Sequence, residues 1–536
     1  MELLNLPIGW RIPEISNKKF TVSWLVTIVF LVLTFSLSAQ TPSVSGKASK
    51  EAYRPRFHFT PITGWMNDPN GMVYYDGEYH LFYQFYPDST VWGPMHWGHA
   101  VSKDLVYWER LPVALYPDSL GYIFSGSAVM DLNNTSGLGT KEEPAMVAVY
   151  TYHNPKLERM GKSDYQYQAI AYSLDKGRTW TKYANNPVVK NPGMRDFRDP
   201  KVSWNAAAGK WIMVLAAGDK VMFYSSPDLL NWTFESDFGK DAGAHGGVWE
   251  CPDLFPMQVG NETKWILIVN INPGGPNGGS AAQYFAGDFD GHRFIPSHKE
   301  TKWIDYGKDN YAGVTWSNIQ DGRTLFIGWM SNWQYGEKVP TRLWRSANTF
   351  PRELKLIREG SGYTLVSWPV KELRLLRTDS VKVTNITVEK LKDLSEKLNG
   401  KISASEISVT FQLPSDTSLY PKDFGLILRN SLKEEVKVGY DFRKGRVYFD
   451  RSNSGKTDFS KDFPVAITAP CSLLGQEFTM NLLVDEASME LFAQNGRIVM
   501  TNIFFPGKEY DKLLIFTNGR PVKIKELKFA GLKSIW

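Results

Sequence analysis

An imperfect repeat in the first 350 residues most constrains what this 536-residue chain can fold into. Four times, a short turn-like segment with an aspartate precedes an aromatic residue: 102–105 before Trp108, 173–177 before Trp180, 226–229 before Trp232, and 290–291 before Phe294. The four aspartates lie 71, 53 and 62 residues apart. That spacing suits a four-stranded blade with its loops, and about 300 residues at this spacing predict roughly five blades of a β-propeller.

The patterning between the repeats is that of strands. Residues 73–75 and 79–85 flank Asp76-Gly77-Glu78 as in a β-hairpin, and no convincing amphipathic helix occurs in this half. After residue 380 alternating apolar and polar residues dominate, and Asn495-Gly496 is a strong hairpin signal. We therefore expect an all-β protein with a propeller at 53–350, a connecting segment at 351–380 and a β-sandwich at 381–536.

The N-terminus is typical of a targeting segment. Arg11, Lys18 and Lys19 precede the uncharged stretch 22–37, and small residues follow at 36–39. This order predicts a signal peptide over 1–39 that is cleaved before Gln40, followed by a polar linker over 40–52. The protein is then secreted or periplasmic and free of the membrane after cleavage. An uncleaved membrane anchor is the alternative.

The composition excludes several classes of function. The net charge is +5, from 61 basic and 56 acidic residues, and no basic run stands out, which argues against nucleic acid as a partner. Two cysteines are too few for a disulfide scaffold or a multi-cysteine zinc site. His96 and His99 alone do not define a metal site. Aromatic residues make up 14% of the chain, which suits either stacking on sugars or core packing.

Three acidic residues have unusual local surroundings. Asp68 and Asp199 each precede a proline, which favours an extended backbone, and Arg198 is next to Asp199. Glu250 follows Trp249. An apolar neighbour raises a carboxyl pKa and an arginine lowers one, and glycoside hydrolysis needs such a divergent pair. Taken singly, each residue can also be a turn, a structural ion pair or a rim residue.

Longer motifs around these acids resemble those of glycoside hydrolase family 32, which includes invertases, levanases and inulinases. The three signature motifs are matched by 65–71, 197–200 and 249–252. Further similar segments occur in the family order at 82–84, 92–93, 96–99, 124–127, 305–307, 311–312, 328–333, 351–354, 484–485 and 488–492. The family fold is a five-bladed β-propeller followed by a β-sandwich, which agrees with the number of blades inferred from the spacing.

The resemblance implies a role for each of the three acids. Asp68 is the nucleophile, Glu250 the general acid/base, and Asp199 the stabiliser of the fructosyl hydroxyls. The implied reaction releases terminal fructose from levan, inulin or sucrose with retention, through a covalent fructosyl-enzyme, and needs no cofactor or metal. The implied substrate-binding residues are Asn67, Gln84, Trp92, Phe124, Ser125, Arg198 and Trp333.

Two other interpretations stay open at this level. Residues 173–180 fit the Asp-box turn of sialidase propellers, but no tyrosine nucleophile with an arginine cluster can be assigned. A catalytically weak fructan-binding protein of the same fold is the second alternative, although all three acids are present. Residues 85–88 differ from the pattern of many relatives, which leaves the choice among sucrose, inulin and levan open. Exo action is expected from the pocket motifs.

Overall fold

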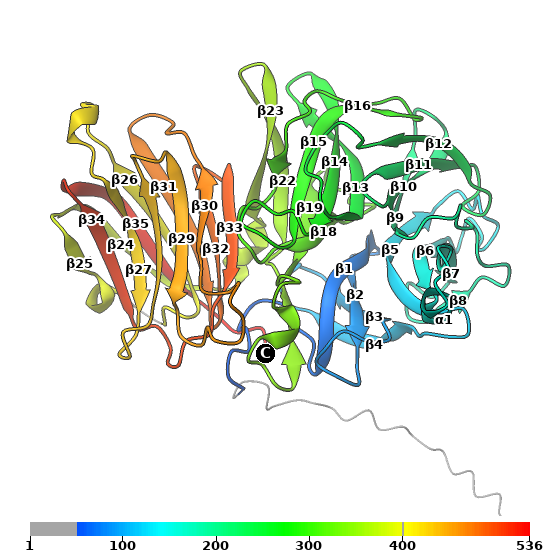
Figure 1. The fold of residues 1–536 in the computed structure, drawn as a ribbon, viewed down its shortest axis with the longest axis horizontal. Helices are drawn as coiled ribbons and strands as arrows, with labels where there is room; N and C mark the ends of the chain where they lie inside the picture. The colour runs from blue at the N-terminus through cyan, green and yellow to red at the C-terminus, as the bar shows by residue number, and fades with distance from the viewer. Residues whose placement is uncertain (1–50, 399–400) are drawn as a thin grey trace, which may run out of the picture. The chain divides into compact units, whose positions relative to one another are not determined.

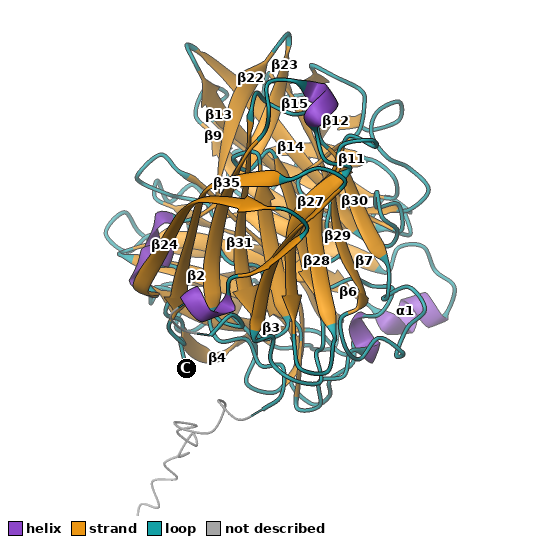
Figure 2. Ribbon diagram, turned by 90° about the vertical axis from the view of Figure 1, so that its left-hand side faces the viewer, coloured by secondary structure: helices purple, strands orange, loops and turns teal. Residues whose placement is uncertain are grey.

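The computed structural model describes residues 51–398 and 401–536, and their regular secondary structure is almost entirely β-strand (Figures 1 and 2). The expected signal peptide and residues 40–50 of the expected linker lie outside this part of the chain. Within the described residues, no helix has both the length and the apolar character needed to cross a bilayer.

Five sheets of at least four strands each follow one another along the first part of the chain, as predicted for a five-bladed propeller. Blade 1 comprises β1 (Gly64–Tyr75), β2 (Glu78–Tyr86), β3 (His96–Ser102) and β4 (Glu109–Leu115). Blade 2 comprises β5 (Tyr122–Asp131), β6 (Ala145–His153), β7 (Gln166–Ser173) and β8 (Thr181–Lys182), with the short helix α1 (Pro155–Arg159) between β6 and β7. Blade 3 comprises β9 (Phe197–Asn205), β10 (Lys210–Ala217), β11 (Val221–Ser226) and β12 (Thr233–Phe238).

The last two blades carry additional short strands. Blade 4 comprises β13 (Val248–Val259), β14 (Glu262–Asn272), β15 (Ala281–Phe289), β16 (Phe294–Pro296) and β17 (Lys302–Trp303). Blade 5 comprises β18 (Tyr311–Thr315), β19 (Thr324–Met330), β21 (Ala347–Asn348), β22 (Arg352–Glu359) and β23 (Gly362–Pro369). Strand β20 (Trp344–Arg345) pairs in parallel with β1, so a segment next to blade 5 joins the sheet of blade 1.

The sequence repeat marks one particular turn in four of the blades. Each of its aspartates lies between the third and fourth strands of a blade, where its carboxylate caps backbone N–H groups. Asp104 accepts from Val106 and Tyr107 at 3.0 and 2.9 Å, and Asp228 repeats this arrangement. In blade 5 the corresponding turn contains Gly360, which adopts a positive φ of 59°. Glycine adopts this conformation without a side-chain cap, so blade 5 lacks the aspartate that marks the other four blades in the sequence.

The expected connecting segment at 351–380 is wrong in its first half. Strands β22 and β23 lie within it, and β22 pairs with β19, so both belong to blade 5. Only the 3-10 helix η3 (Lys371–Leu375) connects them to the first strand of the sandwich. Leu354 and Leu356 are buried and alternate with more exposed residues, as in a strand with one buried face. This pattern marks the stretch as part of a sheet.

The C-terminal part of the chain forms two six-stranded antiparallel sheets, the predicted β-sandwich (Figure 1). The first sheet contains β24 (Arg377–Val388), β26 (Ser405–Gln412), β31 (Glu477–Asp485), β32 (Ser488–Ala493), β33 (Ile498–Ile503) and β35 (Val522–Leu532). The second contains β25 (Leu391–Asp393), β27 (Asp423–Arg429), β28 (Glu435–Asp441), β29 (Arg446–Asn453), β30 (Ala466–Pro470) and β34 (Lys512–Asn518). The 3-10 helices η4 (Ser395–Lys397) and η5 (Thr417–Leu419) lie in loops that connect strands of the two sheets.

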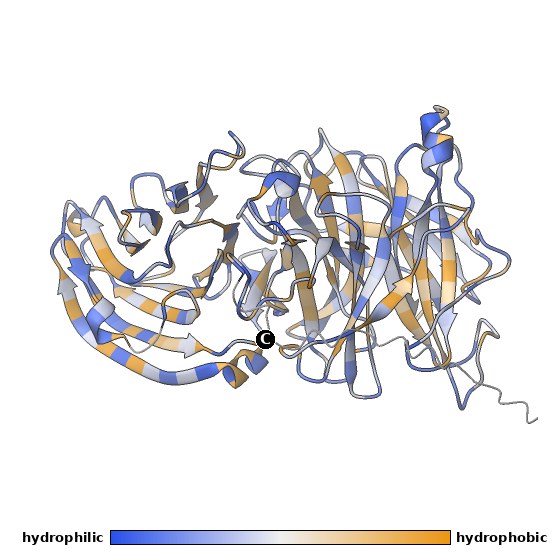
Figure 3. Ribbon diagram, turned by 90° about the horizontal axis from the view of Figure 1, so that it is seen from below, coloured by the Kyte–Doolittle hydropathy of each residue, from blue (hydrophilic) through white to orange (hydrophobic). Residues whose placement is uncertain are grey.

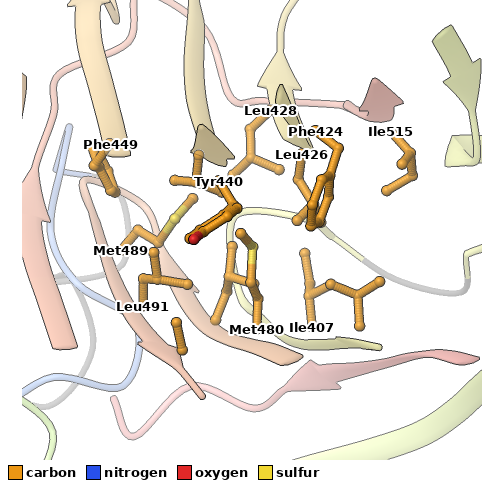
Figure 4. Close-up of a cluster of buried hydrophobic side chains, with 14 of the residues drawn as sticks. Ile407, Phe424, Leu426, Leu428, Tyr440, Phe449, Met480, Met489, Leu491 and Ile515 are labelled. Atoms are coloured by element: carbon orange, nitrogen blue, oxygen red, sulfur yellow. The ribbon is translucent and has the colours of Figure 1, made fainter. Parts of the chain in front are cut away.

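The core of the sandwich follows from the period of two along its strands. In β26, Ile407, Val409 and Phe411 are buried and alternate with half-exposed polar residues. Hydrophobic and hydrophilic residues alternate along many strands in Figure 3. Inward-facing side chains of both sheets, including Phe424 and Met480, meet in one buried cluster (Figure 4). This burial is the main source of stability for the domain.

Buried charges connect the propeller to the sandwich, and the two belong to one compact unit of the chain. Arg352 on β22 donates to Glu490 on β32 at 2.9 Å and to Asp305 at 3.0 Å. His58 contacts Asp485 and Glu490 at 2.7 and 2.8 Å. Each of these charged side chains has an oppositely charged partner, which offsets part of the cost of burying it.

Candidate active site

A β-bulge occurs at the same place in the first strand of every blade. These five first strands contact those of neighbouring blades, and each shows a register shift against its second strand. A bulge inserts an extra residue and re-aims the side chains beside it. A proline or glycine follows each bulged residue, in the pairs Asp68-Pro69, Ser125-Gly126, Asp199-Pro200, Cys251-Pro252 and Ala312-Gly313.

The proline or glycine that follows each bulged residue has a physical reason. Proline cannot donate to a strand ladder and is tolerated in strands mainly at edges and bulges. At Gly126 a Cβ would overlap the carbonyl oxygen of Val149, so the neighbouring strand leaves no room for a side chain. Asp199 and Cys251 adopt positive φ values of 65° and 42°, an uncommon conformation for residues other than glycine. The bulges thus present side chains from different blades to one cavity.

Asp68 is held by three hydrogen bonds. Its Oδ1 accepts from Asn67 Nδ2 at 2.9 Å, and its Oδ2 accepts from Ser125 Oγ at 2.7 Å and Cys251 Sγ at 3.4 Å. The indole N–H of Trp65 donates to Asn67 Oδ1 at 2.7 Å, which fixes the orientation of the Asn67 amide. The carboxylate therefore has one defined orientation in the cavity.

Asp199 is buried on the next but one blade. Its Oδ2 accepts from the backbone N–H of Cys251 at 3.0 Å, and its own N–H donates to Thr151 Oγ1 at 3.0 Å. Arg198 Nε lies 3.9 Å from Asp199 Oδ2. These contacts join blades 2, 3 and 4 beneath the cavity.

Glu250 is bound by a cation and a hydroxyl group. Arg198 Nη2 donates to Oε1 at 3.0 Å, and the hydroxyl of Tyr311 on β18 donates to Oε2. The same guanidinium donates from Nη1 to Asp196 Oδ1 at 2.7 Å. Arg198 is thus shared between two carboxylates.

The close approach of three acids affects their protonation. Burial raises the pKa of Asp68 and the charge of Glu250 adds to this effect, while the hydrogen bonds from Ser125, Asn67 and Cys251 oppose it. Burial raises the pKa of Asp199 to about 7; the attraction of Arg198 opposes this rise, and repulsion from Glu250 and Asp68 adds to it. The cluster can therefore hold a proton near neutral pH.

The neighbouring groups stay in fixed charge states. Burial disfavours the charge on Arg198, but the carboxylates of Glu250, Asp199 and Asp196 raise its pKa well above the ordinary value. Burial and nearby carboxylates raise the pKa values of Cys251 and Tyr311 well above their usual ranges. The thiol and the phenol thus remain protonated donors. Cys251 is a free, buried thiol that contacts both Asp68 and Asp199.

The electrostatic assignment made from sequence neighbours is wrong in detail. Arg198 was expected to lower the pKa of Asp199; its charge acts in that direction, but burial prevails, and its shorter contact is with Glu250 on another blade. Trp249 was expected to shield Glu250, yet its ring is buried among apolar residues and its N–H donates to Ala244 O at 2.9 Å. Adjacent residues in a regular strand point to opposite faces, so the ring of Trp249 points away from the carboxylate of Glu250.

All ten residues singled out from the sequence line one cavity of about 510 Å³. Trp333 stacks on Trp65 with ring centroids 5.8 Å apart, and Trp92 makes an edge contact with Phe124. Gln84 is buried, and its Nε2 has no partner among the described residues, so it is a donor left for a bound molecule. The cavity therefore combines aromatic walls with convergent polar groups. Its ten expected members are Asn67, Asp68, Gln84, Trp92, Phe124, Ser125, Arg198, Asp199, Glu250 and Trp333.

Sequence reasoning missed other lining residues and one contact. The missed lining residues lie at strand ends, in short helices or in loops: His153, Glu158, Tyr165, Gln166, Asp196 and Glu337. Tyr311 was noted only as part of a motif, without a role. Glu337 accepts from the backbone N–H of Trp92 at 3.0 Å, a contact between segments 245 residues apart that no local pattern reveals. Asp196 directly precedes the 197–200 motif, so its position beside the motif was the one sequence signal that could have identified it.

A five-bladed propeller that gathers carboxylates from three of its blades into one sugar-sized cavity defines a glycoside hydrolase of the β-propeller class. Family models bear this out over nearly all of the described chain: the Glycosyl hydrolases family 32 N-terminal domain matches residues 58–369, and the Glycosyl hydrolases family 32 C terminal domain matches 372–531. The chain belongs to glycosyl hydrolase family 32.

Individual relatives agree with this membership. A levanase of Bacillus subtilis (strain 168) is 48% identical over 521 residues, which cover 95% of this chain and 75% of the levanase. An extracellular exo-inulinase of Aspergillus awamori is 38% identical over 519 residues, covering 91% of this chain and 96% of the relative. The crystal structure of exo-inulinase from Aspergillus awamori superposes with a TM-score of 0.83 at 34% identity, covering 91% and 99% of the two chains.

Proposed function

We propose that this protein is a retaining β-fructofuranosidase that releases terminal fructose from levan, inulin or sucrose. The observation that carries the proposal is the meeting of Asp68, Asp199 and Glu250 in one cavity, in a chain closely similar to a levanase and to an exo-inulinase. A β-fructofuranosidase from Schwanniomyces occidentalis, solved with fructosyl-erythritol, also superposes with a TM-score of 0.82 at 33% identity, covering 92% and 99% of the two chains.

The proposed reaction has two steps. Asp68 attacks the anomeric carbon of a terminal fructofuranosyl unit while Glu250 gives its proton to the departing oxygen, which forms a fructosyl-enzyme ester. Glu250, now a carboxylate, then takes a proton from water, and this water cleaves the ester and frees Asp68. Two displacements retain the configuration, and we expect the two carboxyl groups to lie roughly 5 to 5.5 Å apart.

The surrounding groups support these roles. Hydrogen bonds from Asn67 and Ser125 orient Asp68 and favour its ionised form. Asp199, whose carboxylate is held by the backbone of Cys251, is placed to accept hydroxyl groups of the fructosyl unit. Gln84 contributes an unpaired donor, and Trp92 and Trp333 form the aromatic wall. No cofactor or metal is part of the proposed mechanism.

Exo action is the proposed mode. The cavity is of a size suited to a small number of sugar units, and Trp92, Trp333 and Glu337 come together from different segments at its lining. We also propose that the protein is exported by its N-terminal segment. The Aspergillus relatives named as extracellular exo-inulinases support export, and N-terminal sequencing of the mature protein, with a start near Gln40 expected, tests it.

The test of the function is incubation with sucrose, inulin and levan, followed by chromatography of the products. We expect free fructose as the first and main product, and no release by Asp68→Asn. Early accumulation of longer oligosaccharides without fructose would show endo action instead. Binding of fructans by the wild type without any product would favour the alternative of a catalytically weak fructan-binding protein.

A further inference from the structure

One wall of the catalytic cavity has no role in the reaction proposed above. It consists of His153 at the end of β6, Glu158 on helix α1, Gln166 at the start of β7 and Asp196 just before β9. These residues belong to blades 2 and 3, whose strands and helix α1 are labelled in Figure 1. Two of them are carboxylates in addition to the three acids of the reaction.

The local sequence fixes Glu158 in place. Asn154 caps helix α1, since its Oδ1 accepts from the backbone N–H groups of Lys156 and Leu157, each at 3.1 Å. Pro155 follows at the first helical position, where its missing N–H costs nothing. Glu158 is therefore on the first turn of a capped helix, and not on a free loop.

His153 holds one oxygen of Glu158. The imidazole stacks on Phe124 with ring centroids 4.4 Å apart, and its Nε2 lies 3.1 Å from Glu158 Oε2. Its Nδ1 lies 3.3 Å from Nε2 of Gln166, an amide nitrogen that can only donate. With Nδ1 as acceptor, the proton of the neutral ring is on Nε2 and points to Glu158.

The second oxygen of Glu158 is free for a ligand. The side chain is 39% exposed, and among the described residues Oε1 has no hydrogen-bond partner. Asp196 is similar: its Oδ1 accepts from Arg198, and its side chain is 27% exposed. The wall thus offers two carboxylate oxygens that face water in the cavity.

This wall is joined to Glu250 through Arg198. The guanidinium donates to Glu250 at 3.0 Å, to Asp196 at 2.7 Å and to Gln166 Oε1 at 3.4 Å. Glu250 is the group that protonates the departing oxygen, so the leaving group must lie beside it. Apart from Asp199, which is assigned to the fructosyl unit, the carboxylates near the Glu250–Arg198 pair are those of Asp196 and, beyond Gln166 and His153, Glu158.

We propose that Glu158, together with Asp196, binds the hydroxyl groups of the leaving sugar and so forms a subsite for a neutral hexose unit. This inference rests on the proposed function. Carboxylates accept two hydroxyl hydrogens at once, and the stacked rings of Phe124 and His153 supply an adjacent flat surface for the C–H face of a sugar. Glu158 thereby selects donors by their leaving group and takes no part in the bond cleavage itself.

The experiment compares two donors that differ only in the leaving group. Sucrose leaves a glucose with hydroxyl groups, whereas methyl β-D-fructofuranoside leaves methanol, which needs protonation but cannot reach Glu158. For Glu158→Ala we expect kcat/KM to fall by roughly 10- to 100-fold on sucrose, the effect of losing a hydrogen bond to a charged group, and to stay within about threefold on the methyl fructoside. Glu158→Gln retains an acceptor oxygen and should recover part of the loss.

Glu142→Ala is the matched control, because Glu142 is exposed and does not line the cavity. An equal fall on both donors would mean that Glu158 supports the shape of the pocket, which would overturn the subsite. An unchanged kcat/KM on sucrose would overturn it as well. If the wild type released fructose from neither donor, the proposed function itself would be wrong, and the subsite would fall with it.

Discussion

The hydroxyl of Tyr311 donates a hydrogen bond to Oε2 of Glu250, from the first strand of blade 5 to the first strand of blade 4. Arg198 binds the other oxygen of the same carboxylate from blade 3. The proposed acid/base is therefore positioned from both sides by groups on neighbouring blades. Tyr311 stays protonated because burial and the charge of Glu250 raise its pKa well above the usual range.

We predict that Tyr311→Phe lowers kcat/KM on sucrose by about tenfold, because Glu250 loses one of its two positioning contacts. The phenyl ring keeps its edge contact with Trp329, so the thermal unfolding midpoint should change little. Tyr107→Phe, at an exposed position away from the cavity, is the control. Unaltered kinetics in Tyr311→Phe would show that the Arg198 contact alone positions Glu250.

Asp199→Asn should lower kcat/KM by the same factor on all fructosyl donors. Asp199 is proposed to bind the fructosyl unit, which every donor shares, and not the leaving group. We expect equal loss of kcat/KM on sucrose, inulin and fructosyl fluoride, measured as initial rates of fructose or fluoride release. A loss confined to sucrose and inulin would assign Asp199 to the leaving-group side instead.

The stability of the protein should fall as the pH rises toward 9. Burial alone would lower the pKa of His58, but hydrogen bonds to Asp485 and Glu490 raise it to about 9. The folded state thus binds this proton more tightly than the unfolded chain, whose histidine pKa is about 6.5. The contribution, on the order of 3 kcal/mol, is fully present below pH 6.5 and is lost as the pH rises through about 9.

Thermal unfolding between pH 6 and 9.5 measures this contribution. His58→Gln should be less stable at pH 6.5, because Asp485 and Glu490 lose a buried cation, and its midpoint should depend less on pH over this range. Parallel curves for the two proteins would show that His58 does not carry the effect.

The five-bladed propeller and the sandwich could be predicted because their signals are local. The aspartate turns recur at a blade's length, and the strands of the sandwich alternate with a period of two. The number of blades was confirmed, but strands β22 and β23 were missed, because the turn between them contains Gly360 where the other blades have an aspartate. The sequence repeat therefore marks only those blades whose turn between the third and fourth strands contains an aspartate.

The residues of the cavity were predictable where a bulge left a mark in the sequence. Asp68 and Asp199 precede prolines, and Ser125 precedes a glycine, as the bulges require. Glu158 on helix α1 and Glu337 on the 3-10 helix η2 (Gly336–Lys338) carry no such mark and reach the cavity only through the tertiary fold. The contact of Arg198 with Glu250 was also beyond reach, because these residues are 52 positions apart in the sequence and only blade packing brings them together.

The strongest test of the mechanism separates the two catalytic carboxylates by what each donor needs. Asp68→Asn keeps the shape but removes the nucleophile, so we expect almost no turnover on any donor. Glu250→Gln removes the proton donor, which is worth about 10² to 10⁴ in rate. Its kcat/KM should fall sharply on sucrose and remain high on fructosyl fluoride, because fluoride departs without a proton.

In Glu250→Gln, hydrolysis of the fructosyl-enzyme then becomes rate-limiting, since Glu250 must also activate water. Azide needs no general base, so it should accelerate this step and give a fructosyl azide of retained configuration. Equal losses on fluoride and sucrose would refute the acid assignment, and near-normal activity of Asp68→Asn would refute the covalent intermediate.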